Sequence, residues 1–248
     1  MEDQKDFFSI LDSVDSSNNY AMGQVQTGLA RPGQAWFAKE QYAGRGQRGK
    51  TWKSEPGENI ILSIVVKPGK AFSGRPFLFN ALIAVVCHEF FSALAGGETK
   101  IKWPNDIYWR DRKTGGMLIE NIYRGKEWLW AIIGIGININ QDSFDESAGG
   151  ACSLKNITSQ TYDPVMLARQ LHISIIKKAG NATEDQFAQL LQYYNEHLYK
   201  KNEAVMLKKE HAVFQTSIRS VSEYGQLLTE DVTERAFDFG EVVWVNKA

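Results

Sequence analysis

Residues 44–52 form a segment in which three glycines are interspersed with three cations, a composition suited to a backbone loop that closes around an anion. The segment matches two phosphate-binding patterns, G-x-G-x-x-G and G-x-x-x-x-G-K-T, the second of which ends at Thr51. Both patterns bind phosphate where a helix follows the loop and turns its first N–H groups towards the ligand. Pro56 and Gly57 prevent such a helix. The sequence therefore predicts a mobile phosphate-binding loop that joins two strands.

The strand expected before this loop gives the same indication. Residues 39–41 are all polar, whereas a central strand of a parallel sheet is a continuous apolar run. A P-loop NTPase that uses residues 44–51, a dinucleotide-binding fold and a solvated surface loop remain as alternatives.

Length and composition limit the class of protein. A chain of 248 residues can form one large domain, or a large domain and a small one. The net charge of −1 gives no global positive field for nucleic acid or an anionic membrane. Cys87 and Cys152 form neither a disulfide framework nor a metal-binding pattern, which suits a reducing cytoplasm. The first residues lack signal-peptide features, and no uninterrupted apolar run reaches the ~20 residues that cross a bilayer. We expect a cytoplasmic protein without a membrane span.

Hydrophobic patterning divides the chain into a longer part with strands and helices and a C-terminal part with short strands. Strands are expected at 7–11, 35–38, 59–66, 99–102 and 128–140, and helices at 15–25, 76–94, 163–178 and 183–198. Residues 108–112 are expected to form a hairpin turn and residues 142–160 a polar loop. Short strands follow at 204–207, 214–221, 225–229 and 241–245, a spacing that predicts a small barrel.

The helix at 76–94 is apolar nearly all round and is expected in the core. His88 within it lacks the partners of an H-E-x-x-H metal site, so we expect a hydrogen-bonded interior histidine.

Several polar residues stand where a ligand could reach them. Asp106 follows a short strand that Pro104 stops, although an ordinary turn would have the same composition. Lys113 precedes two glycines, which allow the backbone to approach a ligand closely. Gly134 and Gly136 interrupt an apolar strand, which indicates either that something lies against its backbone or that the strand has a bulge.

We call residues 44–52 the Gly-Arg loop. Three further segments follow it along the chain: Lys-Trp-Pro-Asn-Asp at 102–106, Lys-Thr-Gly-Gly-Met-Leu-Ile-Glu at 113–120 and Gly-Ile-Gly-Ile-Asn at 134–138. Together they make the chain resemble the biotin protein ligases between about residues 15 and 140. The resemblance implies an α+β catalytic domain at residues 1–200 with a mixed sheet and packed helices, like the class II aminoacyl-tRNA synthetases. It also implies a small SH3-like β-barrel at residues 201–248 and a monofunctional enzyme without an N-terminal DNA-binding domain.

The resemblance also implies roles for individual residues. The catalytic residues would be Arg45, Lys113 and Asp106, of which Asp106 orients the acceptor lysine and Lys113 reaches the biotin carboxylate and the α-phosphate. The residues that bind biotin would be Ser16, Ser17, Asn18, Gln41, Gly44, Arg45, Lys113, Gly116 and Gly134. Those that bind ATP or the adenylate would be Arg45, Arg48, Trp52, Lys113 and Asn138. Mg²⁺ would be carried mainly by the phosphates, near Asn138.

One position departs from the family pattern. Gln47 stands where family members usually carry an arginine that helps to retain the acyl-adenylate. Retention is therefore weaker here or depends on Arg45, Arg48 and Lys50.

The implied reaction has two steps: biotin and ATP form biotinyl-5′-AMP, and a lysine of a biotin carboxyl carrier protein domain then displaces AMP. The expected protein is a monomer or weak homodimer and binds no DNA. A lipoate-type ligase of the same superfamily, the P-loop NTPase and a non-enzymatic biotin sensor or RNA-binding module remain as alternatives.

Overall fold

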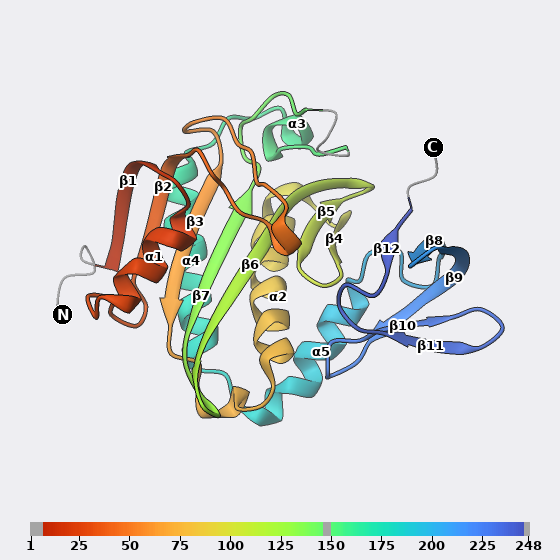
Figure 1. Cartoon of the computed structure of the whole chain (residues 1–248). Coiled ribbons are helices and arrows are strands. Elements are labelled where there is room, and N and C mark those ends of the chain that lie inside the picture. Colours follow the sequence, from red (N-terminus) through yellow and green to blue (C-terminus); the bar gives the residue numbers. More distant parts are fainter. Residues whose placement is uncertain (1–6, 146–149, 246–248) are drawn as a thin grey trace.

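The computed structural model describes residues 7–145 and 150–245. Its larger part is built on a seven-stranded sheet with the strand order β1-β2-β3-β7-β6-β5-β4 (Figure 1). β1 and β2 are parallel, and the remaining neighbours in this sheet are antiparallel. The strands are β1 (Phe8–Val14), β2 (Ala35–Gln41), β3 (Ile60–Val66), β4 (Thr99–Lys102), β5 (Asp106–Trp109), β6 (Arg112–Arg124) and β7 (Glu127–Ile137). The predicted mixed sheet of an α+β protein is confirmed.

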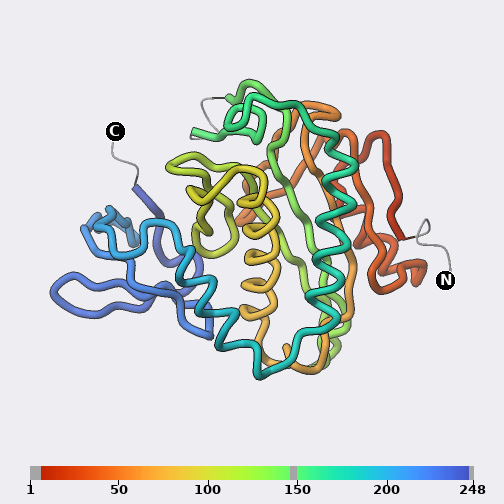
Figure 2. Tube along the Cα trace, turned by 180° about the vertical axis from the view of Figure 1, so that it is seen from behind, coloured from red at the N-terminus to blue at the C-terminus, as the bar shows by residue number. Residues whose placement is uncertain are grey.

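Helices cover the two faces of this sheet unequally. α2 (Pro76–Ala95) and α4 (Pro164–Gly180) pack on one face, and α5 (Phe187–Glu196) packs against α2 (Figure 2). α1 (Ser17–Gln26) lies on the opposite face, against β2, β3 and β7. β3 is buried along its whole length. Its successive side chains point to opposite faces of the sheet, and each face is covered by a cluster of buried apolar residues. The face that α1 covers only in part leaves room for a site.

α2 bears on the expectation that the chain has no membrane span. Among the described residues, Pro76–Ala95 is a helix long and apolar enough to cross a bilayer. However, 61% of its apolar window is buried inside the fold, where the helix contacts α4, α5 and β4. Its apolar surface is therefore used by the core, as the sequence predicts.

The C-terminal part is a five-stranded antiparallel sheet with the order β11-β10-β9-β8-β12. Its strands are β8 (Ala204–Lys209), β9 (Ala212–Val221), β10 (Leu227–Glu230), β11 (Glu234–Phe237) and β12 (Val243–Trp244). This sheet agrees with the expected SH3-like domain. The proposed boundary at residue 201 stays a prediction.

Some local predictions were wrong. α3 (Leu154–Thr158) is a short helix within the predicted polar loop, of which residues 146–149 lie outside the described residues. β11 had no predicted counterpart, β7 ends at Ile137 rather than at residue 140, and β12 is shorter than predicted. Tyr108 and Trp109 belong to β5 rather than to the turn. Short 3-10 turns occur at η2 (Gln47–Gly49), η3 (Lys70–Phe72) and η5 (Glu184–Gln186).

Candidate active site

Two glycines of β7 expose bare backbone towards α1 and the Gly-Arg loop. A Cβ atom on Gly134 would lie 2.4 Å from Asn18 Oδ1, and one on Gly136 would lie 2.5 Å from Trp52 Cε2. The pairing of β7 with β3 and β6 continues without a shift through both glycines. A bulge therefore does not account for them. They permit close contact with the strand, and we call this backbone the glycine strip.

The first turn of α1 supplies buried polar groups beside the glycine strip. Ser16, Ser17 and Asn18 are each at most 5% exposed. Ser16 is the N-cap residue of α1, but its side chain makes no capping hydrogen bond. The hydroxyl of Ser63 instead lies 2.8 Å from Ser17 Oγ and 2.6 Å from Asn18 Oδ1. This network fixes the polar groups by contact with β3.

Asn18 is held from a second direction by β6. Its amide nitrogen donates to Glu120 Oε2 at 2.9 Å and to the Leu118 carbonyl at 3.2 Å. Glu120 also forms an ion pair with Arg45 at 3.1 Å. With both ends bonded, the Asn18 carboxamide has one defined orientation towards Gly134.

The Gly-Arg loop closes against the same groups. The backbone N–H of Ser17 donates to Gln41 Oε1 at 3.3 Å. Gly44 fits between Gln41 and the carbonyl of Trp52, where a Cβ would lie 2.3 Å from that oxygen. Trp52 lies with its indole over Gly136, and its buried Nε1 has no hydrogen-bond partner among the described residues. The loop thus covers the glycine strip with an aromatic ring.

At the far end of the strip is an ion pair. Lys113 Nζ lies 2.7 Å from Asp106 Oδ1, and both side chains are about 30% exposed. Gly116 pairs with Asp106 between β5 and β6, and a Cβ there would lie 2.7 Å from the carboxylate. The ammonium of Lys113 also lies 5.8 Å from the centre of the Trp52 ring. These contacts bring the lysine and the carboxylate to the edge of the strip that Trp52 covers.

Two sequence-predicted residues make other contacts. Arg48 donates to the carbonyl of Gly240 in the C-terminal part, at 3.0 Å, rather than turning towards Lys113. Asn138 is 3% exposed, and its amide donates to the Cys152 carbonyl at 3.2 Å. In this arrangement Asn138 holds the segment that leads into α3.

Ser63 and Glu120 are functional candidates that the sequence interpretation missed. Ser63 is the one polar residue of the apolar strand β3, a signal that could have identified it. Glu120 ends the motif segment at 113–120, but its role comes from Asn18 and Arg45, two partners distant in sequence.

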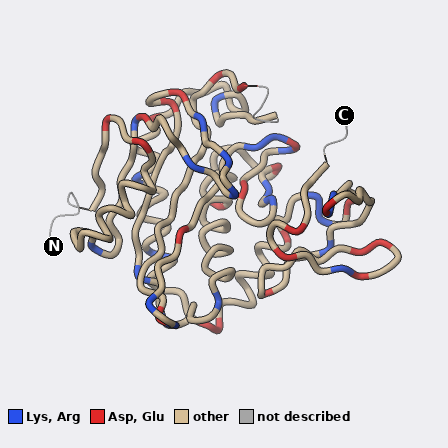
Figure 3. Tube along the Cα trace, in the orientation of Figure 1, with Lys and Arg blue, Asp and Glu red and all other residues tan. Residues whose placement is uncertain are grey.

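Charge around the site is mixed. Figure 3 shows Lys and Arg gathered along the loop between β2 and β3 and on the neighbouring hairpin of β5 and β6, with acidic residues interspersed. Within the described residues, no group of three or more His, Cys, Asp or Glu side chains could hold a metal ion.

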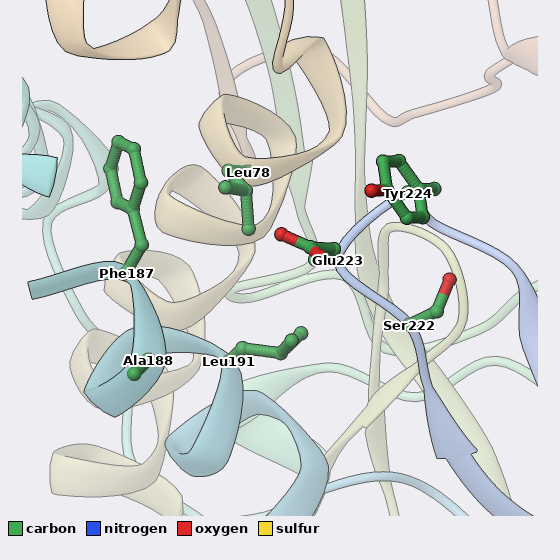
Figure 4. Close-up of a pocket in the computed structure, with 7 residues that line it drawn as sticks. All are labelled: Leu78, Phe187, Ala188, Leu191, Ser222, Glu223 and Tyr224. Atoms are coloured by element: carbon green, nitrogen blue, oxygen red, sulfur yellow. The ribbon is translucent and has the colours of Figure 1, made fainter.

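A separate pocket of about 420 Å³ lies between α2, α5 and the turn that joins β9 to β10 (Figure 4). It is lined by Leu78, Phe187, Ala188, Leu191, Ser222, Glu223 and Tyr224. None of the candidate residues described above contributes to it.

Comparison with known proteins places these features in a family. A family model described as the biotin/lipoate A/B protein ligase family matches residues 10–138. The bifunctional ligase/repressor BirA of Escherichia coli (strain K12) is 33% identical over 139 residues, which are 56% of this chain and 42% of that protein. The biotin--[acetyl-CoA-carboxylase] ligase of Paracoccus denitrificans is 30% identical over 161 residues, 62% of this chain and 65% of that protein. The chain thus spans less than half the length of the first relative.

Among solved structures, the fold is similar to that of the biotin protein ligase from Aquifex aeolicus in complex with biotin and ATP. The TM-score is 0.81 at 24% identity, over 97% of this chain and 99% of that one. This likeness covers the mixed sheet and the C-terminal sheet together. The matched family region, more than half of the chain, contains the Gly-Arg loop, the ion pair of Lys113 and Asp106, and the glycine strip. The chain therefore belongs to the biotin/lipoate A/B protein ligase family.

Proposed function

We propose that the protein is an ATP-dependent biotin ligase that makes biotinyl-5′-AMP and transfers the biotinyl group to a lysine of a biotin carboxyl carrier protein domain. The observation that carries this proposal is the ion pair of Lys113 and Asp106, 2.7 Å long, at the end of the glycine strip. Lys113 supplies a cation that can attract the anionic substrates. Asp106, beside it, supplies a carboxylate that can bind the amine of the acceptor lysine.

The first step must bring two anions together. The biotin carboxylate attacks the α-phosphorus of ATP, and the bond from that phosphorus to the diphosphate breaks. Lys113 attracts both anions and so lowers the main electrostatic barrier. Its ammonium would then exchange the contact with Asp106 for contacts with substrate oxygens.

That exchange leaves Asp106 available for the second step. The incoming lysine amine attacks the biotinyl carbonyl carbon, AMP leaves with the bonding electron pair, and the amine loses a proton. A freed carboxylate at this place can orient the amine and accept the proton. The single ion pair thus serves both steps in turn.

The ureido ring of biotin needs fixed donors and acceptors in an otherwise apolar site. Ser17, Asn18 and Gln41 offer such groups at the buried start of α1, bonded through Ser63 and Glu120. Biotin lying along the glycine strip would reach from this polar end to Lys113. Trp52 would move from Gly136 onto the bound adenylate.

ATP would bring its own metal. Mg²⁺ would be held mainly by the phosphates of ATP and would neutralise part of their charge. Asn138 donates its amide nitrogen to the Cys152 carbonyl, so its side-chain oxygen is the atom that could serve as a ligand for a cation carried by the phosphates. Cys87 and Cys152 are buried free thiols, in keeping with the reducing cytoplasm that we propose as the location.

The test is pyrophosphate exchange into ATP, followed by transfer to a carrier domain. We expect exchange that depends on biotin and not on lipoate, and label from biotin on one carrier lysine. Lys113→Ala should lower the exchange rate by about 100-fold or more, since it removes the cation next to the developing charge. Lys50→Ala is the matched control and should lower it by less than about tenfold.

The opposite order of these two variants would support the P-loop alternative and contradict the proposal. In the structure, residues 44–51 are followed by no helix before β3, so the helix of a P-loop is absent from this described segment. Exchange that depends on lipoate instead of biotin would identify the other ligase of the superfamily.

A further inference from the structure

Lys102, the last residue of β4, has an unusual environment for a lysine. Its ammonium lies 4.5 Å from the ring centre of Tyr108, 4.9 Å from that of Trp244 and 5.4 Å from that of Tyr199. It donates to the Tyr108 hydroxyl at 3.1 Å. The rings come from β5, from β12 of the C-terminal sheet and from the segment after α5. We call these three residues the aromatic cage.

The cage supplies no negative charge, and the carboxylates around it are already paired. Asp106, directly opposite Lys102 in the β4–β5 register, is bonded to Lys113. Asp111 is bonded to Lys200 at 2.9 Å and accepts a hydrogen bond from Tyr199 at 2.8 Å. Within the described part of the chain, no carboxylate lies within 4.0 Å of Lys102 Nζ.

A buried ammonium without a counter-ion is costly. Burial lowers the pKa of Lys102 to about 8, against the opposite effect of Asp106. A buried ammonium that has no bonded carboxylate and lies at the edge of the candidate active site is a candidate for binding an anion of the substrate. The cage holds its ammonium in place beforehand, so little side-chain freedom is lost when the anion binds.

Position decides which anion fits. Lys102 and Lys113 both flank Asp106, so Lys102 lies next to the point where the phosphates of ATP would meet biotin. In the proposed reaction, Lys113 already takes the biotin carboxylate and the α-phosphate. The diphosphate leaving group carries the most charge, and the two reaction steps proposed above give no residue the task of binding it.

Resting on the proposed function, we infer that Lys102 in its aromatic cage binds the β- and γ-phosphates of ATP, and the diphosphate that leaves. The trapped ammonium donates its remaining N–H groups to these oxygens. Trp244 and Tyr199 hold it there, so the C-terminal sheet contributes to the diphosphate site without touching the ligand.

The experiment is exchange of labelled pyrophosphate into ATP by the full chain, measured over a range of pyrophosphate concentrations. Lys102→Met should raise the KM for pyrophosphate by about tenfold or more, as expected when a charged hydrogen bond is lost. Its KM for biotin should stay within about twofold. Lys102→Arg keeps a charge in the cage and should retain most of the affinity for pyrophosphate.

Two comparisons separate this role from a structural one. Lys100→Met makes the same change two residues earlier on β4, and it should leave the KM for pyrophosphate unchanged. Transfer from preformed biotinyl-5′-AMP to a carrier domain involves no diphosphate, so Lys102→Met should perform it at the wild-type rate. If Lys102→Met proves unstable, Trp244→Leu, which opens the cage, should raise the same KM.

The pH dependence is a further readout. The groups that face Lys102 are Asp106, Tyr108, Lys113, Lys50, Asp111 and Tyr199. With its pKa lowered to about 8, the ammonium of Lys102 loses its charge as the pH rises through that region, so the KM for pyrophosphate should rise around pH 8 in the wild type. It should not do so in Lys102→Arg, because a guanidinium stays charged.

The outcomes distinguish the two proposals. If the wild type catalyses biotin-dependent exchange and Lys102→Met has the same KM for pyrophosphate, the inference about Lys102 is overturned and the proposed function stands. Loss of transfer from preformed biotinyl-5′-AMP in that variant also overturns it, and points to the acceptor as the ligand of Lys102. Absence of biotin-dependent exchange in the wild type overturns the proposed function and this inference with it.

Discussion

At position 134, glycine is needed because the neighbouring atoms leave no room for a side chain, and not because of its backbone conformation. A Cβ there would meet Asn18, whose amide is fixed by Ser63, Glu120 and the Leu118 carbonyl and cannot move away without breaking these bonds. The sequence left open whether something lies against this glycine or the strand has a bulge. It did not predict that Asn18 does so.

We therefore predict that Gly134→Ala displaces Asn18 and raises the KM for biotin by about 100-fold or more, because a fixed group of the ring site is lost. The KM should be measured in the exchange assay together with the melting temperature. Gly69→Ala is the control, since a Cβ at Gly69 meets nothing within 4 Å. An unaltered KM in Gly134→Ala would contradict the position proposed for biotin.

His88 is the satisfied interior histidine that the sequence predicted. Its Nε2 lies 3.0 Å from the Thr99 carbonyl and must donate to it, and its Nδ1 lies 3.1 Å from the Tyr193 hydroxyl. Burial lowers the pKa of His88 to about 4 from its ordinary value of 6.5. Both ring nitrogens are used by the neutral form, which excludes a metal-ligand role in this fold.

The lowered pKa predicts how stability varies with pH. Between pH 6.5 and about 4 the unfolded chain binds a proton at His88 and the folded chain does not. Stability from this group is thus complete above pH 6.5 and falls as the pH drops, by a total on the order of 3 kcal/mol. His88→Gln should lack this part of the fall when the free energy of unfolding is measured by urea titration from pH 4 to 7.

The exposed His211 offers the control for that series. His211→Gln should follow the wild-type pH dependence, and His172 is present in all three proteins, so its contribution cancels. An identical pH dependence in His88→Gln and the wild type would show that His88 does not remain neutral in the folded state.

At the scale of elements, the Gly-Arg loop was predicted in part. Pro56 and Gly57 indicated correctly that no helix follows residues 44–52, because this rule depends on local backbone geometry alone. A rule of local backbone geometry could not predict which residues the loop contacts. Trp52 reaches Gly136, and Arg48 reaches Gly240, which is 192 residues further along the chain.

The position of Trp52 predicts an optical signal. Its indole is packed on Gly136 with Nε1 unpaired, so biotin and ATP should move it when they occupy the glycine strip. We expect a change in tryptophan fluorescence on adding both ligands to the wild type. Trp52→Phe should lose most of the change, although six other tryptophans remain of the seven in the chain.

The fluorescence experiment needs a control variant that lacks a different tryptophan. Trp130 lies in β7 on the side of the small core cluster of α1, and Trp130→Phe should retain the signal. A full signal in Trp52→Phe would mean that the indole does not respond to the ligands.

At the scale of the molecule, the sequence predicted the classes of elements and the two-part division better than the arrangement. The buried strand β3 and helix α2 were found because they are strongly apolar, and α4 because Asp163 caps it before Pro164. The strand order could not be predicted, because β7, which forms a hairpin with β6, also pairs with β3 through contacts distant in sequence. In the candidate site, the residues with expected roles were identified by resemblance, whereas the roles of Ser63, Glu120 and Lys102 were recognised from their contacts in the structure.

The two parts are joined by a continuous core. Buried residues of the C-terminal sheet, such as Leu207, Ile218 and Leu227, belong to the same cluster as those of α2 and β7. The indole of Trp103, next to Lys102, donates to the carbonyl of Gly225 at 2.9 Å. The predicted boundary at residue 201 therefore separates two sheets that share buried contacts.

From this shared core we predict one cooperative unfolding transition. Far-ultraviolet circular dichroism and tryptophan fluorescence should give coincident urea curves, as for a two-state protein. Trp103→Phe, which leaves the Gly225 carbonyl unpaired, should lower the free energy of unfolding by about 1–3 kcal/mol. Two separate transitions would show that the parts fold independently.

The central proposal is that biotin and its adenylate lie on the glycine strip between Asn18 and Lys113. A crystal structure of the protein with biotin and ATP, or with a non-hydrolysable analogue of biotinyl-5′-AMP, would test it. We predict that the ligand lies over Gly134 and Gly136, that Trp52 has left Gly136, and that Lys113 contacts ligand oxygens instead of Asp106. A ligand bound elsewhere, with Trp52 still on Gly136 and the ion pair of Lys113 and Asp106 intact, would contradict the account.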